Sequence, residues 1–357
     1  MKRSLTRRDF LLRSTAAVGV FSPLFSSRQI APAGAPPLAG RNKSLVWRPG
    51  NLSAGAGPAE KFSGIFAILS TPFDQTDQID WEDLDREVKF CNRAGVQGLV
   101  WPQLAAEFYL LSEDERLRGA EVIVRAAAGR TPVVIGVQAP ESHLTGKFAR
   151  HAERQGASAL ISLPPYLGSI SLETAAGYYH ALAHETKLPI FIQNSGPPWG
   201  AALPTEFVIQ LAKENPQFGY IKEEVAPVAH RIGEYSQSRV MKGIFSGNAG
   251  RNFLDDRSHG ADGTMPACEF IDVDVQVVAL AAQNKLPEAR VIFEKLLPMI
   301  NLEEIYGLHF VKEVLVRRRV FKTAKLRGIT NGELDERDRK ELDAWWQELA
   351  PYMRIQE

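Results

Sequence analysis

Cysteine is scarce in this chain, and so are regular spacings of metal ligands. The 357 residues contain two cysteines, Cys91 and Cys268, and seven histidines. Two cysteines are too few for a disulfide framework, and neither a CxxC nor an HExxH pattern occurs. The i,i+4 pair His180 and His184 is more typical of a helix surface than of a zinc site. We therefore expect no metal and no other cofactor.

An excess of charge of either sign is also missing. Lysine plus arginine and aspartate plus glutamate number 42 each, so the formal net charge is zero. Nothing indicates a broad basic face for nucleic acid, and the run Arg317-Arg318-Arg319 is typical of a solvated helix face. Hydrophobic residues make up 45% of the chain, which is enough for a sizeable core.

A long apolar run is missing near the amino terminus. Residues 16–25 are too short and interrupted to span a bilayer permanently, and they follow Thr6-Arg7-Arg8-Asp9-Phe10-Leu11-Leu12. Consecutive arginines followed by Phe and Leu are typical of a twin-arginine export signal, and a basic tail without structure is the alternative. We expect residues 1–35 to be this signal, read by the twin-arginine export machinery. Residues 36–61 would be a flexible linker, and the protein would be periplasmic or otherwise exported.

From residue 62 onward, short apolar runs alternate with amphipathic helical patterns. The runs are continuously apolar, as expected of parallel strands buried on both faces. The expected strands are residues 64–69, 98–101, 132–136, 159–163, 189–193, 218–222, 242–246 and 263–265. Eight strand–helix units predict a closed (β/α)8 barrel, which needs about 250 residues. An open doubly wound sheet is the alternative, but no GxGxxG follows the first strand.

Helical patterns fill the segments between these strands and continue beyond them. Ser112, three residues before Glu115, predicts a capping box at the start of one helix. The expected helices include residues 81–94, 112–128, 141–155, 172–186, 204–215 and 225–236. The barrel would occupy residues 62–283, and the patterns at 287–321 and 332–352 predict a C-terminal helical extension over residues 284–357.

One lysine ends the sixth apolar run. Lys222 is followed by Glu223 and Glu224. An unpaired ammonium is costly to bury, so a buried amine tends to lose its proton and becomes a nucleophile that condenses with ketones. A salt bridge with Glu223 or Glu224 is the structural alternative. Because catalytic groups of (β/α)8 barrels lie at the carboxyl ends of the strands, the position favours the nucleophile.

Seven motifs occur in a fixed order along the chain. They are GIFAILSTPF from Gly64, GVQGLV from Gly95, PVVIG from Pro132, LPPY from Leu163, LPIFI from Leu188, IKE from Ile221 and FSGN from Phe245. This set resembles the dihydrodipicolinate synthase/N-acetylneuraminate lyase family of Schiff-base class I aldolases and dehydratases. The resemblance implies a (β/α)8 barrel with a C-terminal helical extension, often a tetramer. It also implies that Lys222 forms an imine with a 2-keto acid.

Several groups of the family pattern are absent. The family usually has Gly-Thr-Thr-Gly-Glu after the second strand, where hydroxyls and amides hold the carboxylate of the keto acid; here residues 103–107 are Gln-Leu-Ala-Ala-Glu. Backbone N–H groups around Ala105 and Ala106 can still bind a carboxylate. The general acid/base tyrosine of strand five is matched by Gln193, which orients a carbonyl or a water but does not titrate. The family's carboxylate-binding arginine has no counterpart in residues 194–200.

Two titratable candidates remain near the strand ends, Glu107 and Tyr166. Glu107 either takes part in catalysis or braces a helix. Tyr166 either takes part in catalysis or packs in the pocket wall or at a subunit contact. Asn194, Ser246 and Asn248 are candidates for contacts with the substrate. No strand end carries the histidine and carboxylate ligands that a metal-dependent barrel aldolase would need.

These observations predict a Schiff-base lyase that acts through Lys222 on a small-molecule 2-keto acid. Some sugar-acid dehydratases of the family carry Gln in an Ile-Gln-Asp-like stretch, which Ile192-Gln193-Asn194 resembles. This favours aldol cleavage or dehydration of a 2-keto-3-deoxy sugar acid. The alternative, motivated by the missing partner groups, is a catalytically impaired member that serves as a periplasmic keto-acid-binding or structural protein.

Overall fold

The computed structural model describes residues 61–168, 170–328 and 332–355. These described residues belong to one compact unit. The predicted export signal and all but the last residue of the predicted linker lie outside the described residues, so export stays a prediction. No helix within the described ranges has both the length and the apolar character needed to cross a bilayer.

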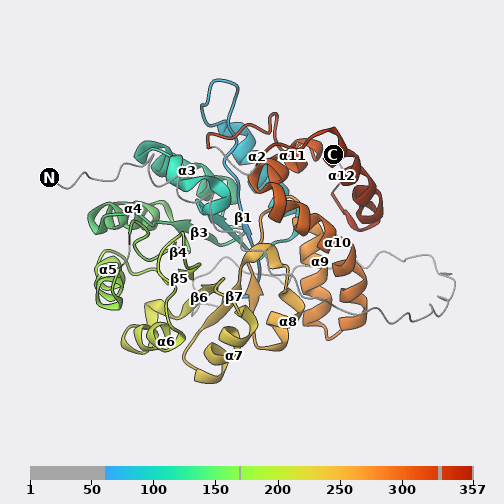
Figure 1. Ribbon diagram of the computed structural model, residues 1–357. Coiled ribbons are helices and arrows are strands. Elements are labelled where there is room, and N and C mark those ends of the chain that lie inside the picture. Colours follow the sequence, from blue (N-terminus) through green and yellow to red (C-terminus); the bar gives the residue numbers. More distant parts are fainter. Residues whose placement is uncertain (1–60, 169, 329–331, 356–357) are drawn as a thin grey trace. The chain divides into compact units, whose positions relative to one another are not determined.

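Eight parallel strands form a closed barrel in sequence order (Figure 1). Each strand pairs with the next one in the chain, and β1 closes the ring by pairing with β8. The strands are β1 (Gly64–Ile68), β2 (Gly98–Trp101), β3 (Val133–Gly136), β4 (Ala159–Ser162), β5 (Ile190–Asn194), β6 (Tyr220–Glu223), β7 (Gly243–Ser246) and β8 (Gly263–Thr264). The predicted (β/α)8 barrel is confirmed, and each strand lies within two residues of its expected bounds.

Helices surround the strands (Figure 1). They are α2 (Trp81–Ala94), α3 (Glu113–Ala127), α4 (Ser142–Gln155), α5 (Leu172–His184), α6 (Thr205–Glu214), α7 (Val228–Ser238), α8 (Phe253–Ser258) and α9 (Ile271–Ala282). The Ser112–Glu115 capping box begins α3 as predicted. Gly95 and Gly156 end α2 and α4 with φ of 85° and 91°, a left-handed conformation that glycine adopts without a steric penalty.

Short 3₁₀ turns complete the connections between the regular elements. Two of them follow β2 directly, and a third follows β7. They are η1 (Leu104–Ala106), η2 (Phe108–Leu110), η3 (Pro216–Phe218), η4 (Asn248–Gly250) and η5 (Ala350–Tyr352). The first two and η4 lie at the carboxyl ends of strands, where barrel enzymes carry their chemistry.

The barrel interior is packed with aromatic rings. Phe66 contacts Phe245 with ring centroids 4.9 Å apart, and Phe191 contacts Tyr220 at 4.8 Å. Because side chains alternate between the two faces of a strand, the residue two positions after Tyr220 also faces the interior, one layer nearer the carboxyl ends. That residue is Lys222.

Three further helices form the predicted C-terminal extension, α10 (Leu286–Tyr306), α11 (Leu308–Arg317) and α12 (Glu336–Leu349). They pack with α9 around a second hydrophobic core, in which α10 lies against α9 and also contacts α11 and α12 (Figure 1). Residues 320–328, here called the strap, run from α11 to the β1–α2 loop, where the Thr323 hydroxyl donates to the Phe73 carbonyl at 2.7 Å.

The arginine run at the end of α11 is not wholly solvated. Arg318 is 6% exposed, and its two terminal nitrogens donate to the Asp272 carboxylate at 2.7 and 2.8 Å. The prediction of a solvated run is therefore wrong for Arg318, because α11 packs against the first turn of α9 at this point. A bidentate arginine–carboxylate pair satisfies both charges in the buried contact.

Candidate active site

Lys222 lies at the carboxyl end of β6, inside the barrel. In the sheet it is level with Gln193 of β5 and Phe245 of β7. Its side chain is 5% exposed. The stem therefore crosses the apolar interior layer, and the amine emerges where the loops after the strands converge.

The nearest charged partner of this amine is Glu224. Lys222 Nζ and Glu224 Oε1 are 3.0 Å apart, and the Glu224 side chain is 11% exposed. Gln193 Nε2 donates to Glu224 Oε2 at 2.7 Å, and the Ser195 hydroxyl donates to the same oxygen. The salt bridge weighed as a structural alternative is thus present, with Glu224 rather than Glu223 as the partner, and it lies inside the barrel mouth.

Burial and the neighbouring charge shift the pKa of the Glu224 carboxyl group in opposite directions. Burial alone would raise the pKa of this carboxyl group, but the Lys222 ammonium and the hydrogen bonds from Ser195 and Gln193 outweigh it, so the pKa lies below its ordinary value. The result is a carboxylate held next to an amine in a partly water-excluded site. The sequence identified Glu224 only as a structural partner of Lys222. Its role as a titrating neighbour depends on β6 alternation, which places residues 222 and 224 on the same side.

A missing side chain makes room for Glu224. A Cβ atom added to Gly247, directly after β7, would lie 2.3 Å from Glu224 Oε1 and 2.6 Å from its Cδ. Asn248, the first residue of η4, also contacts this carboxylate: its N–H donates to Oε1 at 3.4 Å, and its side-chain amide donates to the Glu224 carbonyl at 3.2 Å. Asn248 therefore lies beside Glu224, and its contact with the substrate stays a prediction.

Two glutamines occupy the opposite side of the barrel mouth. Gln103 Nε2 donates to Gln138 Oε1 at 3.1 Å, and Gln138 Nε2 donates to the Pro102 carbonyl at 2.9 Å. A Cβ atom on Gly136 would lie 2.5 Å from Gln103 Nε2, so the Gln103 amide covers the end of β3. The sequence places both glutamines at strand ends but indicates no role for them.

The hydrogen bonds fix which way these amides point. The Pro102 carbonyl can only accept, so Gln138 donates to it and Gln103 must donate to Gln138. Likewise, Gln193 donates to the Glu224 carboxylate. Within the described part of the chain, Gln103 Oε1 and Gln193 Oε1 are then left buried without a hydrogen-bond donor. Unpaired buried acceptors are costly, so both oxygens are available to accept a hydrogen bond from a ligand or from water.

Asn194 and Ser246 face away from the barrel interior. Asn194 Nδ2 donates to Glu223 Oε2 and to the Leu203 carbonyl, each at 3.0 Å. Ser246 follows the interior residue Phe245 and lies beside Asp256 of α8. The prediction that these two side chains contact the substrate is therefore wrong. Alternation along β5 and β7 places both in the layer between strands and helices.

The Glu107 carboxylate is bound by groups of the C-terminal extension rather than by groups around Lys222. Its Oε2 accepts from Lys312 Nζ at 2.7 Å, and both side chains are fully buried. Its Oε1 accepts the backbone N–H groups of Arg327 and Gly328, each at 3.0 Å. All three donors come from α11 and the strap rather than from groups around Lys222, which favours the bracing alternative for Glu107.

Some backbone groups of the turn formed by residues 104–106 are also already hydrogen-bonded within the protein. The Ala106 N–H donates to the Gln103 carbonyl at 2.9 Å, which removes this amide from the predicted carboxylate contact. The Ala106 carbonyl accepts from Thr71 Oγ1 at 2.7 Å. Ala105 remains the candidate amide in this turn.

Tyr166 belongs to an aromatic wall beside the strand ends. Its ring meets that of Phe108 edge-on, with centroids 5.4 Å apart, and Tyr109 lies against Trp199 at 4.9 Å. Tyr166 is 8% exposed. This placement agrees with a residue of the pocket wall, and a catalytic role for Tyr166 stays a prediction. Across the described ranges, no group of three or more His, Cys, Asp and Glu side chains could hold a metal ion.

Residues 61–347 match the dihydrodipicolinate synthetase family. The chain belongs to this family. A probable 2-dehydro-3-deoxy-D-pentonate aldolase of Escherichia coli is 28% identical over 253 residues, which is 70% of this chain and 83% of the relative. The L-2-keto-3-deoxyarabonate dehydratase of Azospirillum brasilense is 26% identical over 245 residues, 67% of this chain and 79% of the relative. These relatives support a lyase.

Solved structures have the same fold. Dihydrodipicolinate synthase from Rhodopseudomonas palustris superposes with a TM-score of 0.74 at 24% identity, over 80% of this chain and 97% of that one. A prophage protein of the family from Escherichia coli, solved in complex with pyruvate, gives 0.75 at 21% identity, over 81% and 99%. One similar structure is described as a monomeric variant, so a tetramer stays a prediction for this chain.

Proposed function

We propose that the protein is a lyase that forms a Schiff base between Lys222 and a 2-keto acid, with Glu224 as the adjacent general acid and base. The observation that carries this proposal is the enclosed Lys222–Glu224 pair at the barrel mouth, with 3.0 Å between nitrogen and oxygen. The Schiff-base chemistry of the family supports the lysine. The position of Glu224 supplies the titrating group that Gln193 cannot provide.

The pair can carry the proton transfers of imine formation. Transfer of one proton from the Lys222 ammonium to Glu224 gives a neutral amine beside a neutral acid. The amine adds to the C2 ketone of the substrate, and the resulting carbinolamine loses its hydroxyl as water when Glu224 returns the proton. The iminium then accepts the electron pair released when a C–C bond breaks or when a proton leaves C3.

The remaining groups suit the two ends of a hydroxylated keto acid. By the sequence resemblance, the Ala105 amide in η1 corresponds to the group with which the family holds the substrate carboxylate. Gln103 Oε1 and Gln193 Oε1 are buried acceptors that need donors, and hydroxyl groups supply them. This pattern, together with the names of the two sugar-acid relatives, supports a 2-keto-3-deoxy sugar acid as the substrate class.

Borohydride reduction tests the proposal. Wild-type protein treated with pyruvate and borohydride is expected to gain the mass of one reduced pyruvate adduct on Lys222, because reduction fixes the iminium as a stable secondary amine. Lys222→Ala is expected to gain none. Peptide mass spectrometry locates the adduct, and Lys242→Ala, a lysine outside the site, is the matched control. Equal adduct mass in wild type and Lys222→Ala would show that the lysine is not the nucleophile.

The binding-protein alternative makes the opposite prediction for turnover. It was motivated by the loss of the family's titrating tyrosine, and Glu224 fills that chemical role. No further observation favours it. Ligand-induced stabilisation without adduct formation or product release would support it over the lyase.

A further inference from the structure

We propose that Glu107, Lys312 and the backbone N–H groups of Arg327 and Gly328 form a latch through which the C-terminal extension positions the substrate-binding turn η1. The inference rests on the proposed function for the role of that turn. It concerns positioning residues, because none of the four groups is placed against the reacting atoms.

The first argument is the backbone of Glu107. This residue joins η1 to η2 with φ of 52° and ψ of 37°, a left-handed conformation that non-glycine residues adopt only when their surroundings enforce it. Its N–H donates to the Leu104 carbonyl at 3.0 Å and so closes η1. Whatever fixes Glu107 therefore also fixes the turn on its amino-terminal side.

The second argument is that the three groups that bind the Glu107 carboxylate come from the C-terminal extension. Lys312 lies on α11, 205 residues further along the chain, and Arg327 and Gly328 lie at the end of the strap, 220 and 221 residues further. The Lys312 ammonium also donates to the Lys325 carbonyl at 2.8 Å and lies 4.4 Å from the centre of the Phe73 ring. One buried cation thus joins α11, the strap and the β2–α3 connection.

The strap is held on its barrel side by charged contacts. Arg327 donates twice to Glu115 at 2.8 and 2.6 Å, and Lys325 pairs with Asp77 at 3.1 Å. Lys322 pairs with Asp80 at 2.8 Å. Cations of the strap therefore match acidic residues of the β1–α2 loop and of the first turn of α3.

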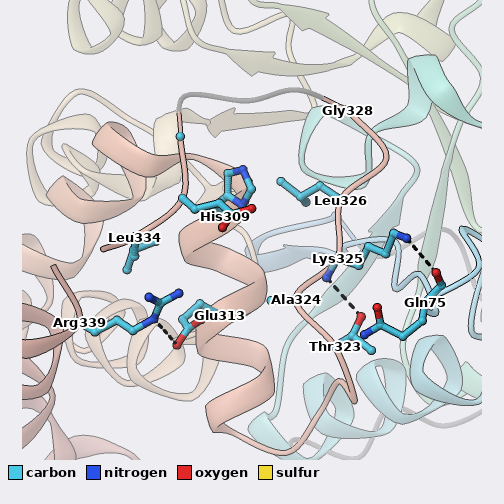
Figure 2. A pocket seen from close by; sticks show the side chains of 12 residues that line it. Gln75, His309, Glu313, Thr323, Ala324, Lys325, Leu326, Gly328, Leu334 and Arg339 are labelled. Carbon is cyan, nitrogen blue, oxygen red and sulfur yellow. Dashed lines mark hydrogen bonds and ion pairs between the residues drawn. The ribbon is translucent and has the colours of Figure 1, made fainter. Parts of the chain in front are cut away.

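On its other side, the part of the strap from Thr323 to Gly328 borders a pocket of about 660 Å³. Figure 2 shows His309 and Glu313 of α11 on one side of this pocket and Ala324 and Leu326 of the strap on the other. Val320 and Phe321 fix the start of the strap in the hydrophobic core. Because the part from Thr323 onward borders the pocket instead, we infer that ion pairs and hydrogen bonds determine the position of that part. Glu107 is the contact that connects this position to η1.

Hydrogen exchange measured by mass spectrometry on the full chain tests the latch. Lys312→Met is expected to speed exchange of peptides covering residues 103–111 by about tenfold, the scale of one lost hydrogen bond to a charged group. Peptides from β5 and β6 are expected to exchange as in wild type. The matched control is Lys295→Met, which removes an exposed pair with Glu348 on α10 and α12 and should leave residues 103–111 unchanged.

A second variant keeps the latch testable if Lys312→Met does not fold. Lys312→Met leaves a buried carboxylate without its cation, which is strongly destabilising. The double variant Glu107→Gln/Lys312→Met removes both charges and is expected to fold, while still speeding exchange at residues 103–111. Wild-type exchange rates at residues 103–111 in the folded double variant would overturn the latch.

A binding measurement separates positioning from mere bracing. In the double variant, the pyruvate concentration for half-maximal borohydride trapping at Lys222 is expected to rise about tenfold, with the maximal adduct yield unchanged. Faster exchange with unchanged pyruvate dependence would overturn the positioning role. If wild type forms no adduct at all, the proposed function fails, and the exchange experiment still decides whether the latch holds the turn.

Discussion

At the scale of single residues, the site lacks the titrating tyrosine of the family pattern and has the titrating carboxyl group of Glu224 beside the lysine. Gln193 stands where the family pattern has its acid/base tyrosine, and this glutamine instead donates to Glu224 at 2.7 Å. Glu224 in turn contacts the Lys222 amine. In the proposed mechanism, proton transfer therefore moves from β5 to the residue just after β6, while the lysine keeps its place.

Glu224→Gln tests this role of Glu224 without requiring the natural substrate. A Schiff base of pyruvate loses a C3 proton to form an enamine, so an active site with a suitable base exchanges the methyl protons of pyruvate for solvent deuterium. Glu224→Gln keeps the shape of the side chain and removes its basicity, so the exchange rate is expected to fall about 10²- to 10⁴-fold. Proton NMR of pyruvate in deuterated buffer measures the rate.

The control for this substitution is a residue that donates a hydrogen bond to the Glu224 carboxylate. Ser195→Ala removes one hydrogen bond to Glu224 but leaves the carboxylate, so a loss well below that of Glu224→Gln is expected. Exchange at the wild-type rate in Glu224→Gln would assign the base to another residue, with Tyr166 as the next candidate.

Because the pKa of Glu224 is lowered from 4.5, wild-type exchange should be lost by protonation of this group only below about pH 4.5.

Side-chain direction was the part of the site that the sequence could not supply. The strands are apolar on both faces, so their sequences show no alternation from which to read which residues face inward. Asn194 and Ser246 were therefore grouped with their neighbours at the strand ends. The interior positions of Phe191 and Phe245 resolve the ambiguity, because Asn194 lies three positions after Phe191 and Ser246 one position after Phe245, and odd steps along a strand lead to the side that faces the helices.

At the scale of elements, the loop after β7 supports the base. Gly247 has no side chain where Glu224 lies, and a Cβ atom there would come within 2.3 Å of Oε1. Gly247→Ala is therefore expected to displace the Glu224 carboxylate from Lys222 and to slow pyruvate deuterium exchange by at least about tenfold, the scale at which small misplacements reduce catalysis. The same NMR assay measures it, with circular dichroism to verify the fold.

Gly177 on α5 provides the matched glycine control. A Cβ atom there would have no neighbour within 4 Å, and alanine is favoured over glycine in a helix by about 0.5–1 kcal/mol. Gly177→Ala is expected to leave exchange unchanged and to raise the free energy of unfolding slightly. If both variants retain wild-type exchange, the space left by Gly247 does not govern the position of Glu224.

The regular elements were predictable because their signals are local. Continuous apolar runs, helix caps and terminal glycines each lie within a few residues of the element they specify, and the (β/α)8 order follows from their succession. The Glu107–Lys312 contact spans 205 residues and depends on how the extension packs against the barrel. No local pattern encodes it, so the sequence left open whether Glu107 braces or catalyses.

At the scale of the whole molecule, buried carboxyl groups connect stability to pH. Burial raises the pKa of Glu87 from 4.5 to about 8, although the Cys268 thiol and the Ser70 N–H donate to the carboxyl group at 2.8 Å each. Burial also raises the pKa of Asp256 to about 6 and that of Glu269 above its ordinary value. At pH values between its ordinary pKa and its raised pKa, each of the three groups is therefore protonated in the folded chain and ionised in the unfolded chain.

For Glu87, the direction of the effect follows from the two pKa values. Below about pH 4.5 both states are protonated, and the contribution to stability is complete. Between about pH 4.5 and 8 only the folded state keeps the proton, so unfolding releases it and becomes more favourable as the pH rises. Above about pH 8 both states are ionised, and the contribution is lost.

Glu87→Gln removes this titration while keeping the acceptor for Ser70 and Cys268. Between pH 5 and 8, the free energy of unfolding of wild type is expected to fall more steeply than that of the variant, by up to about 1.4 kcal/mol per pH unit. Urea unfolding at each pH measures both slopes. Glu336→Gln, at a side chain 85% exposed, is the control and should leave the slope as in wild type. Parallel curves for wild type and Glu87→Gln would mean that Glu87 is already ionised in the folded protein at neutral pH, with its charge compensated by the nearby Lys312 rather than removed by protonation.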